Sequence, residues 1–143
     1  MPASARSGPD LLVDTSVAVA LTVADHEQHE ETLAALAGRR LGLAGHAAFE
    51  TFSVLTRLPP PARRTPSTVG RLLLTTFPHT RFLGSDSARS LLARLETIGI
   101  GGGSVYDALV GAAAAEHGLV LATRDRRALA AYRLLDLEVE LLG

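Results

Sequence analysis

Leu11-Leu12-Val13-Asp14-Thr15-Ser16 places an aspartate directly after three large apolar residues. Such a short apolar run is typical of a strand buried on both faces of a parallel sheet. We therefore expect Asp14 at the carboxyl end of that strand, where an ionised carboxylate needs hydrogen bonds or a compensating charge. The simplest source is the next helix, because an N-cap aspartate accepts from the amide of Ser16 or Val17. Capping alone is common, so Asp14 by itself does not establish a functional site.

Strands and helices are predicted to alternate along the chain. Short apolar runs predict further strands at residues 41–44, 80–83, 119–122 and 138–142. Start and stop signals predict helices at residues 16–24, 26–40, 46–58, 65–76, 85–98, 104–117 and 125–133. This order predicts an α/β fold, a three-layer α/β/α sandwich with a central, mostly parallel sheet. We expect one domain over residues 11–143, preceded by a flexible tail of residues 1–10.

The composition excludes several kinds of chemistry. The 143 residues include no cysteine, which excludes disulfides, zinc–thiolate sites and thiol nucleophiles. All 14 basic residues are arginine, and a chain without lysine has no Walker-type phosphate loop and no Schiff-base chemistry. The net charge of -1 predicts no strong general affinity for nucleic acid. The longest apolar run, at residues 17–23, is shorter than the ~20 residues of a membrane span, and we expect a cytoplasmic protein.

Three further acids share the situation of Asp14. In open parallel sheets, binding sites lie outside the carboxyl ends of the strands. Asp125 lies just past the predicted strand 119–122, and Glu50 lies in the helix that follows the second strand. Asp107 lies in the first turn of the helix that leads into strand 119–122. The predicted fold can therefore bring four carboxylates from separate segments to one edge of the sheet.

Each of these acids also has an ordinary explanation. Glu50 is equally explained as part of a solvated stripe on its helix. Asp107 interacts favourably with the helix N-terminus that a capping-box variant at Ser104 is predicted to open. Asp125 is suited to cap the next helix, and its arginine neighbours either pair with it or bind phosphate; they are Arg124, Arg126 and Arg127.

A cluster of four carboxylates predicts a divalent cation. Several ionised acids held within a few ångströms repel one another, so the cluster needs a cation or bound protons. Magnesium prefers oxygen ligands, typically one or two carboxylates with waters. Zinc is a poor alternative, because cysteine is absent and the five histidines, at positions 26, 29, 46, 79 and 117, are scattered.

Four segments of the chain resemble the PIN-domain nucleases, and especially the VapC-type toxins of prokaryotic toxin–antitoxin pairs. In chain order they are Leu-Val-Asp14-Thr-Ser, Phe-Glu50-Thr-Phe-Ser-Val-Leu-Thr-Arg-Leu, Val-Tyr-Asp107-Ala-Leu-Val and Leu-Ala-Thr-Arg-Asp125. The resemblance implies a PIN-like sandwich that is a magnesium-dependent endoribonuclease, with Mn²⁺ as a substitute for Mg²⁺. It further implies a homodimer that a cognate antitoxin protein holds inactive, the antitoxin tail reaching the acidic pocket.

The same resemblance assigns roles to the four acids. Asp14 and Asp107 match the usual metal-ligand positions, and Glu50 and Asp125 match the other acids of the catalytic site. RNA phosphodiester bonds would be cleaved by a metal-activated water. Arg63-Arg64 and the cluster at 124–127 are candidate RNA contacts.

Two other functions compete with this interpretation. The first is a nuclease-like fold that only binds and regulates a partner. It is disfavoured because a pure binding module has no reason to keep four clustered charges. The second is a phosphotransferase or phosphatase with Asp14 as the nucleophile. It is disfavoured because Ser16 stands where a second aspartate is expected and because lysine is absent.

Overall fold

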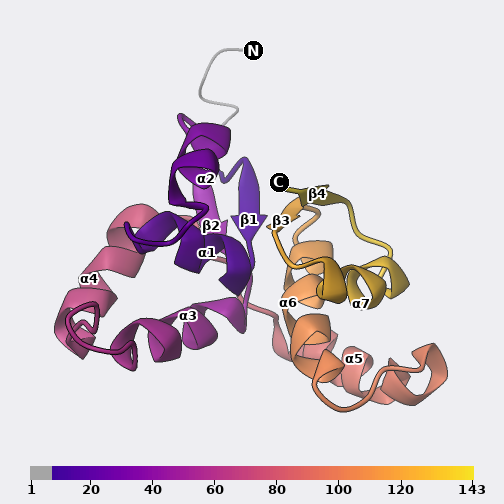
Figure 1. Cartoon of the computed structure of the whole chain (residues 1–143). Coiled ribbons are helices and arrows are strands. Elements are labelled where there is room, and N and C mark those ends of the chain that lie inside the picture. The colour runs from indigo at the N-terminus through magenta and orange to yellow at the C-terminus, as the bar shows by residue number, and fades with distance from the viewer. Residues whose placement is uncertain (1–7) are drawn as a thin grey trace.

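A four-stranded parallel sheet forms the centre of the computed structural model, which describes residues 8–143 (Figure 1). In the spatial order β2-β1-β3-β4, its strands are β2 (Leu41–Leu43), β1 (Leu11–Val13), β3 (Leu121–Thr123) and β4 (Val139–Leu141). The tail expected at residues 1–10 lies mostly outside the described residues. Asp10, which is described, forms an ion pair of 3.2 Å with Arg40.

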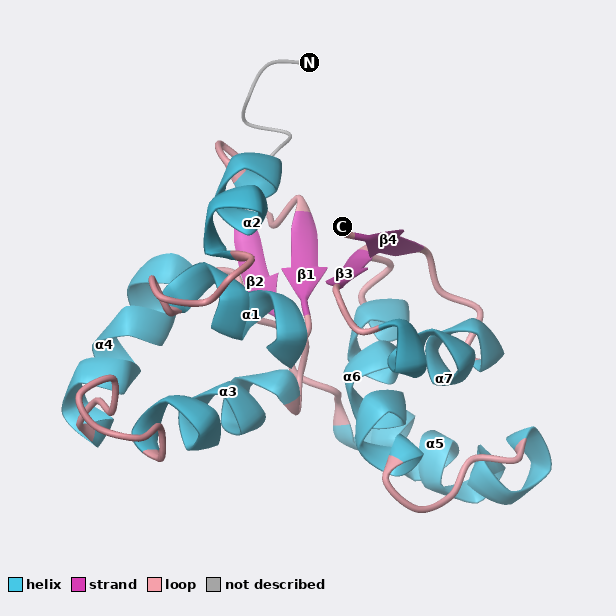
Figure 2. Cartoon of the chain, viewed as in Figure 1, coloured by secondary structure: helices cyan, strands magenta, loops and turns pink. Residues whose placement is uncertain are grey.

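Helices occupy the connections between the strands. They are α1 (Thr15–Thr22), α2 (His29–Leu36), α3 (Ala47–Thr56), α4 (Pro66–Thr76), α5 (Ser85–Ile98), α6 (Ser104–Glu116), the 3-10 helix η2 (Arg126–Ala128) and α7 (Leu129–Leu134). Figure 2 shows α1, α2 and α4 on one side of the sheet and α6 and α7 on the other. Among the described residues, none of the helices combines the length and the apolar character that crossing a membrane requires.

The sheet is buried on both faces by two separate apolar clusters. Successive strand residues point to opposite faces, so Leu11 and Val13 face one side and Leu12 faces the other. The first two pack against α1, α2 and α4 through Val17, Leu36 and Leu73. Leu12 packs against α6 and α7 through Val110 and Tyr132. The predicted α/β/α sandwich is therefore confirmed.

The strand order creates a switch point between β1 and β3. From β1 the chain crosses to β2 on one side, and from β3 it crosses to β4 on the other side. In doubly wound sheets, the connections then diverge and leave a crevice at the carboxyl ends of the two strands. The Asp14 amide donates to the carbonyl of Ala122 over 3.1 Å, so the residues that follow β1 and β3 lie side by side.

The strand predicted at residues 80–83 was wrong. This segment forms a single parallel bridge, between Ala44 and Arg81, and not a strand. The hydroxyl of Thr80 accepts a hydrogen bond from the Leu43 amide over 3.0 Å. The Thr80 hydroxyl thus takes the place of a backbone carbonyl as the acceptor for β2, and it limits the hydrogen-bonded ladder at this edge of the sheet.

Several helix boundaries also differ from the prediction. The helix expected at 26–40 extends only over α2, and the helix expected at 125–133 is divided into η2 and α7. The capping box predicted at Ser104 was wrong, because Gly103 is the N-cap of α6 and no side chain caps it. Thr65 is the N-cap of α4, since its side chain accepts from the Thr68 amide.

Gly42 allows the 77–81 segment to approach β2 closely. A Cβ atom at this position would lie 2.1 Å from the carbonyl oxygen of His79. Backbone lies on both sides of this contact, so it cannot be relieved by a side-chain rotation. Gly70 offers a contrast, because its added Cβ would meet nothing within 4 Å and it lies inside α4.

We expect Gly42→Ala to destabilise the protein by about 1–3 kcal/mol, because β2 and the His79 backbone must separate. Gly70→Ala should instead stabilise it by about 0.5–1 kcal/mol through helix propensity. Urea unfolding followed by circular dichroism measures both. Equal stability of the two variants would contradict this account of the sheet edge.

Candidate functional site

A cavity of about 230 Å³ opens at the switch point and contains all four predicted acids. Its lining residues come from both ends and the middle of the chain: Asp14, Thr15, Ser16, Glu50, Asp107, Val110, Asp125 and Tyr132. Asp14 follows β1, Glu50 lies in the first turn of α3, and Asp107 lies in the first turn of α6. Asp125 follows β3 and caps η2. The structure therefore brings the four predicted residues to one place.

Asp14 is the most buried of the four acids, with 4% of its surface exposed. Its Oδ1 accepts hydrogen bonds from the Ser16 hydroxyl at 2.6 Å and the Val17 amide at 3.2 Å. Its Oδ2 accepts from the Tyr132 hydroxyl at 2.9 Å. Asp14 therefore caps α1, as the sequence suggested, and it also forms the floor of the cavity.

Burial has the largest effect on the Asp14 carboxyl and raises its pKa above the ordinary value of 3.8. Hydrogen bonds from Ser16, Thr123 and Tyr132 act in the opposite direction, because they stabilise the anion. They do not fully offset the loss of hydration. The metal-free site therefore carries a carboxylate that is costly to ionise.

Asp107 is coupled electrostatically to the three other acids. Its pKa is raised first by burial and then by the negative charges of Asp125, Glu50 and Asp14. Arg127 acts in the opposite direction and lowers this pKa. Asp107 thus experiences repulsion from each of the other three carboxylates, as is expected of a cation site.

The arginines beside Asp125 have different roles. The guanidinium of Arg124 is almost fully buried and bonds to α2 and the loop before it, through Gln28, Glu31 and Thr32. Its predicted availability to phosphate was therefore wrong. Arg127 remains available to a phosphate, because 93% of its side chain is exposed. Its Nε lies 3.3 Å from Asp125 Oδ1.

Two further residues of the site, Tyr132 and Thr123, were not predicted from the sequence. Tyr132 is buried in α7 and bonds to Asp14, although 118 residues separate the two in sequence. The Thr123 hydroxyl accepts from the Asp125 amide at 3.0 Å and lies 3.5 Å from the Ser16 hydroxyl. The only signal for Tyr132 was its position seven residues after Asp125, two helical turns further along the chain.

The donor set of the cavity fits a hard divalent cation. All four charged groups are carboxylates, and Thr15 contributes a buried hydroxyl oxygen that has no hydrogen-bond partner. Within residues 8–143, no three acids or histidines lie close enough together to form a complete ligand cluster. A hard cation that is held by one or two carboxylates and several waters does not require such a cluster.

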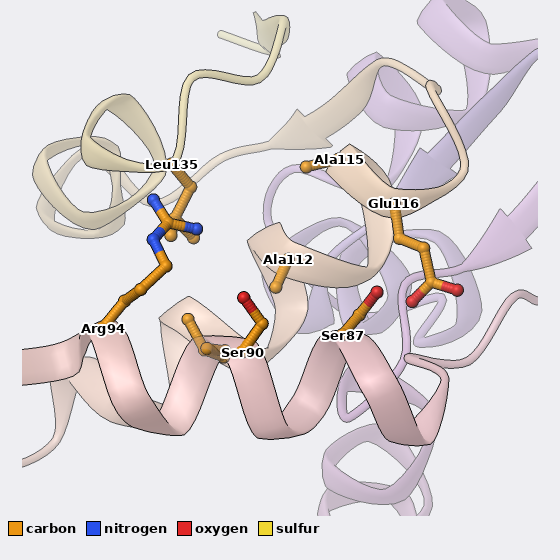
Figure 3. Close-up of a pocket in the computed structure, with 8 residues that line it drawn as sticks. Ser87, Ser90, Arg94, Ala112, Ala115, Glu116 and Leu135 are labelled. Atoms are coloured by element: carbon orange, nitrogen blue, oxygen red, sulfur yellow. The ribbon is translucent and has the colours of Figure 1, made fainter.

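A separate cavity of about 260 Å³ lies between α5 and α6, and none of the four acids of the candidate site lines it (Figure 3). Figure 3 shows Ser87, Ser90, Arg94 and Glu116 around it. Glu116 accepts from the Gly84 amide at 2.9 Å and a bond from Ser87, and these bonds lower its pKa. Glu116 therefore fastens the start of α5 to the end of α6, a structural role.

Comparison with known proteins agrees with this architecture. The PIN-domain family profile matches residues 11–134. Ribonuclease VapC27 of Mycobacterium tuberculosis is 47% identical over 131 residues, covering 92% of this chain and 96% of that protein. Ribonuclease VapC40 of the same species is 46% identical over 131 residues and covers 90% and 96%.

Several solved structures have the same fold. FitAcB from Neisseria gonorrhoeae superposes with a TM-score of 0.66 at 20% identity, covering 90% of this chain and 95% of that one. VapC20 of Mycobacterium tuberculosis, a sarcin–ricin loop cleaving toxin, superposes with a TM-score of 0.65 at 22% identity, covering 85% and 94%. The extent of the family match and the identity to the curated relatives show that this chain belongs to the PIN-domain family, among the VapC proteins.

Proposed function

We propose that this protein is a divalent-metal-dependent endoribonuclease and the toxin of a toxin–antitoxin pair. The observation that carries the proposal is the cavity in which Asp107 is coupled to three other carboxylates. The relatives VapC27 and VapC40 are both named ribonucleases, which supports RNA as the substrate. A catalytically inactive binding module would have no use for this charge repulsion.

Asp14 and Asp107 are the residues that would hold the cation, and Mg²⁺ is the ion that we propose. When bound, such an ion polarises the phosphodiester and lowers the pKa of water, which supplies a nucleophile near neutral pH. Glu50 and Asp125 complete the wall of negative charge that attracts it. Either carboxylate is also a suitable acceptor for the proton that the attacking water loses.

The remaining residues of the cavity position these groups. Ser16, the Val17 amide and Tyr132 hold both Asp14 oxygens in fixed directions. Arg127 is the exposed cation beside the site and offsets charge on the phosphate. The alternative of Asp14 as a phosphoryl-accepting nucleophile is disfavoured, because Ser16 stands where a second aspartate is expected and the chain has no lysine.

We propose a cognate antitoxin as the partner protein, and a homodimer as the active assembly. The solved relatives support a protein partner, since one of them is VapBC2 from Rickettsia felis bound to a promoter DNA fragment. An acidic cavity suits an inhibitor that presents arginine, because a guanidinium neutralises and bonds to carboxylates. Such an inhibitor would compete with the cation for Asp107.

We expect Asp107→Asn to reduce RNA cleavage by about a hundredfold or more, because a cation ligand is lost. It should also abolish the rise in melting temperature that Mg²⁺ causes in the wild-type protein. Asp86→Asn is the matched control, because Asp86 is fully exposed in the first turn of α5. Normal cleavage by Asp107→Asn in Mg²⁺ would refute the site.

The same substitution should stabilise the metal-free protein near neutral pH. The folded pKa of Asp107 is raised above 3.8, so the folded state holds more protons and its stability falls as the pH rises through that window. The melting temperature of Asp107→Asn in a chelator should therefore exceed that of wild type at neutral pH and converge with it below about 3.8. A variant less stable than wild type at neutral pH would contradict this account.

Tyr132→Phe should lower cation affinity and cleavage by about tenfold, the effect typical of a group that orients a metal ligand. The change removes the donor to Asp14 Oδ2 and should also reduce stability by about 1–2 kcal/mol. Calorimetric titration with Mg²⁺ measures the affinity, and urea unfolding measures the stability. Loss of stability with unchanged Mg²⁺ affinity would assign Tyr132 a purely structural role.

A further inference from the structure

The side chain of Arg124 is buried against α2 and does not line the acidic cavity. Only 6% of this side chain is exposed. Its Nε donates to Gln28 Oε1 at 2.9 Å, and its Nη1 donates to Thr32 Oγ1 at 3.1 Å. Its Nη2 donates to Glu31 Oε1 at 3.3 Å. Each of the three guanidinium nitrogens therefore has a partner at the N-cap or in the first turn of α2.

Stability alone does not account for this burial. Removing a guanidinium from water is costly, and a buried ion pair is often less stabilising than apolar side chains of similar volume. Within residues 8–143, Glu31 is the only carboxylate at ion-pair distance from Arg124, and its side chain is 59% exposed. Such an exposed partner gains little from the pair. The arrangement suits a geometric role, because a planar guanidinium holds its acceptors in set directions.

The backbone of Arg124 is connected to the deepest carboxylate of the cavity through one hydroxyl. The Arg124 amide donates to Ser16 Oγ at 2.9 Å, and the same hydroxyl donates to Asp14 Oδ1 at 2.6 Å. A serine hydroxyl has a single proton, and here the amide occupies one of its lone pairs. The Arg124 amide therefore favours the rotamer in which the Ser16 proton points to Asp14.

The turn that contains Arg124 lies between regular elements. β3 ends at Thr123 and η2 begins at Arg126, so Arg124 and Asp125 belong to neither. The Asp125 amide donates to Thr123 Oγ1 at 3.0 Å, and the Asp125 carboxyl lines the cavity. The Arg124 side chain connects this turn to α2, which is itself fixed in the core through the buried Leu36.

We propose that Arg124 is a positioning residue of the cation site: its guanidinium fixes the turn after β3 against α2, and this turn orients Asp14 and Asp125. The inference rests on the proposed function, in which Asp14 holds the cation. Arg124 acts on Asp14 through the Ser16 hydroxyl and on Asp125 through the backbone. The guanidinium bonds to α2 and not to the cavity, so loss of its three directed bonds should disturb the site more than loss of its charge.

A contact with an RNA phosphate is the other role open to an arginine in this segment. Arg124 is poorly suited to it, because its nitrogens are engaged and its side chain is buried. Arg127, with 93% of its side chain exposed, is accessible to a phosphate. The two roles predict different results for lysine, which preserves a charge but cannot bond to three acceptors in set directions.

The test measures Mg²⁺ affinity by calorimetric titration of the whole protein and of three variants. We expect Arg124→Met and Arg124→Lys both to lower the affinity by about tenfold, the effect typical of a group that supports a metal ligand. Gln28→Met removes one acceptor from the side of α2 without changing the cavity lining, and it should lower the affinity by a smaller factor. Arg89→Met is the matched control, because Arg89 lies in α5 and is 81% exposed.

Cleavage kinetics separate positioning from substrate contact. At saturating Mg²⁺, Arg124→Met should lower kcat by about tenfold and change the KM for RNA little, because no contact with the substrate is lost. In the Arg124→Met protein, Gln28→Met should cause no further loss of Mg²⁺ affinity, since both changes remove the same contact.

Amide hydrogen exchange in the metal-free protein gives a signal that depends on neither cation nor RNA. The Arg124 amide, which is bonded to Ser16, should exchange about tenfold faster in Gln28→Met because the turn opens locally. The Leu12 amide in β1, bonded to the Val120 carbonyl, is the internal reference and should exchange at the wild-type rate. Such a difference excludes a general loss of stability.

Three results would overturn the proposal. The first is wild-type exchange and wild-type Mg²⁺ affinity in Gln28→Met, which also decides the matter if Arg124→Met does not fold. The second is wild-type Mg²⁺ affinity in Arg124→Lys, which would assign the role to charge. The third is a raised KM with unchanged kcat in Arg124→Met, which would make Arg124 an RNA contact. The proposed nuclease function is tested separately, by cleavage in Asp107→Asn.

Discussion

The burial of one carboxylate at the end of β1 determines how the rest of the site is arranged. Asp14 sits where two neighbouring strands diverge, and it is removed from water on almost all sides. A carboxylate in such a place is tolerable only when donors converge on it. Three of its donors come from the start of α1 and from α7, so contacts that make the charge acceptable also join these two helices.

The other three acids are less buried than Asp14, and the four carboxylates therefore differ in their electrostatic environment. Glu50, Asp107 and Asp125 are only partly buried, and Asp107 experiences the field of all three companions. The repulsion destabilises the metal-free protein and is relieved when a cation binds. Stability and activity therefore conflict in this cavity. Carboxylates placed close together favour cation binding, but they lower the stability of the protein when no cation is bound.

The sequence predicted the fold class and the meeting of the four acids because both depend on local patterns. Apolar runs followed by acids mark the carboxyl ends of β1 and β3, and the α/β order then places those ends together. Three features were beyond such patterns. The segment at 80–83 fails as a strand because the Thr80 side chain bonds to the backbone, Arg124 is taken by α2, and Tyr132 reaches Asp14 across the core. Each depends on contacts between distant parts of the chain, which no local spacing records.

The hydrogen bond from Tyr132 to Asp14 can form only late in the synthesis of the chain. Synthesis on the ribosome supplies Asp14 first, and the hydroxyl that holds its second oxygen only 118 residues later. A nascent chain that has not yet released α7 leaves a carboxylate oxygen without its donor and lacks one wall of the cavity. A translation product that ends before α7 would thus contain the four acids but not the hydroxyl that holds Asp14 Oδ2.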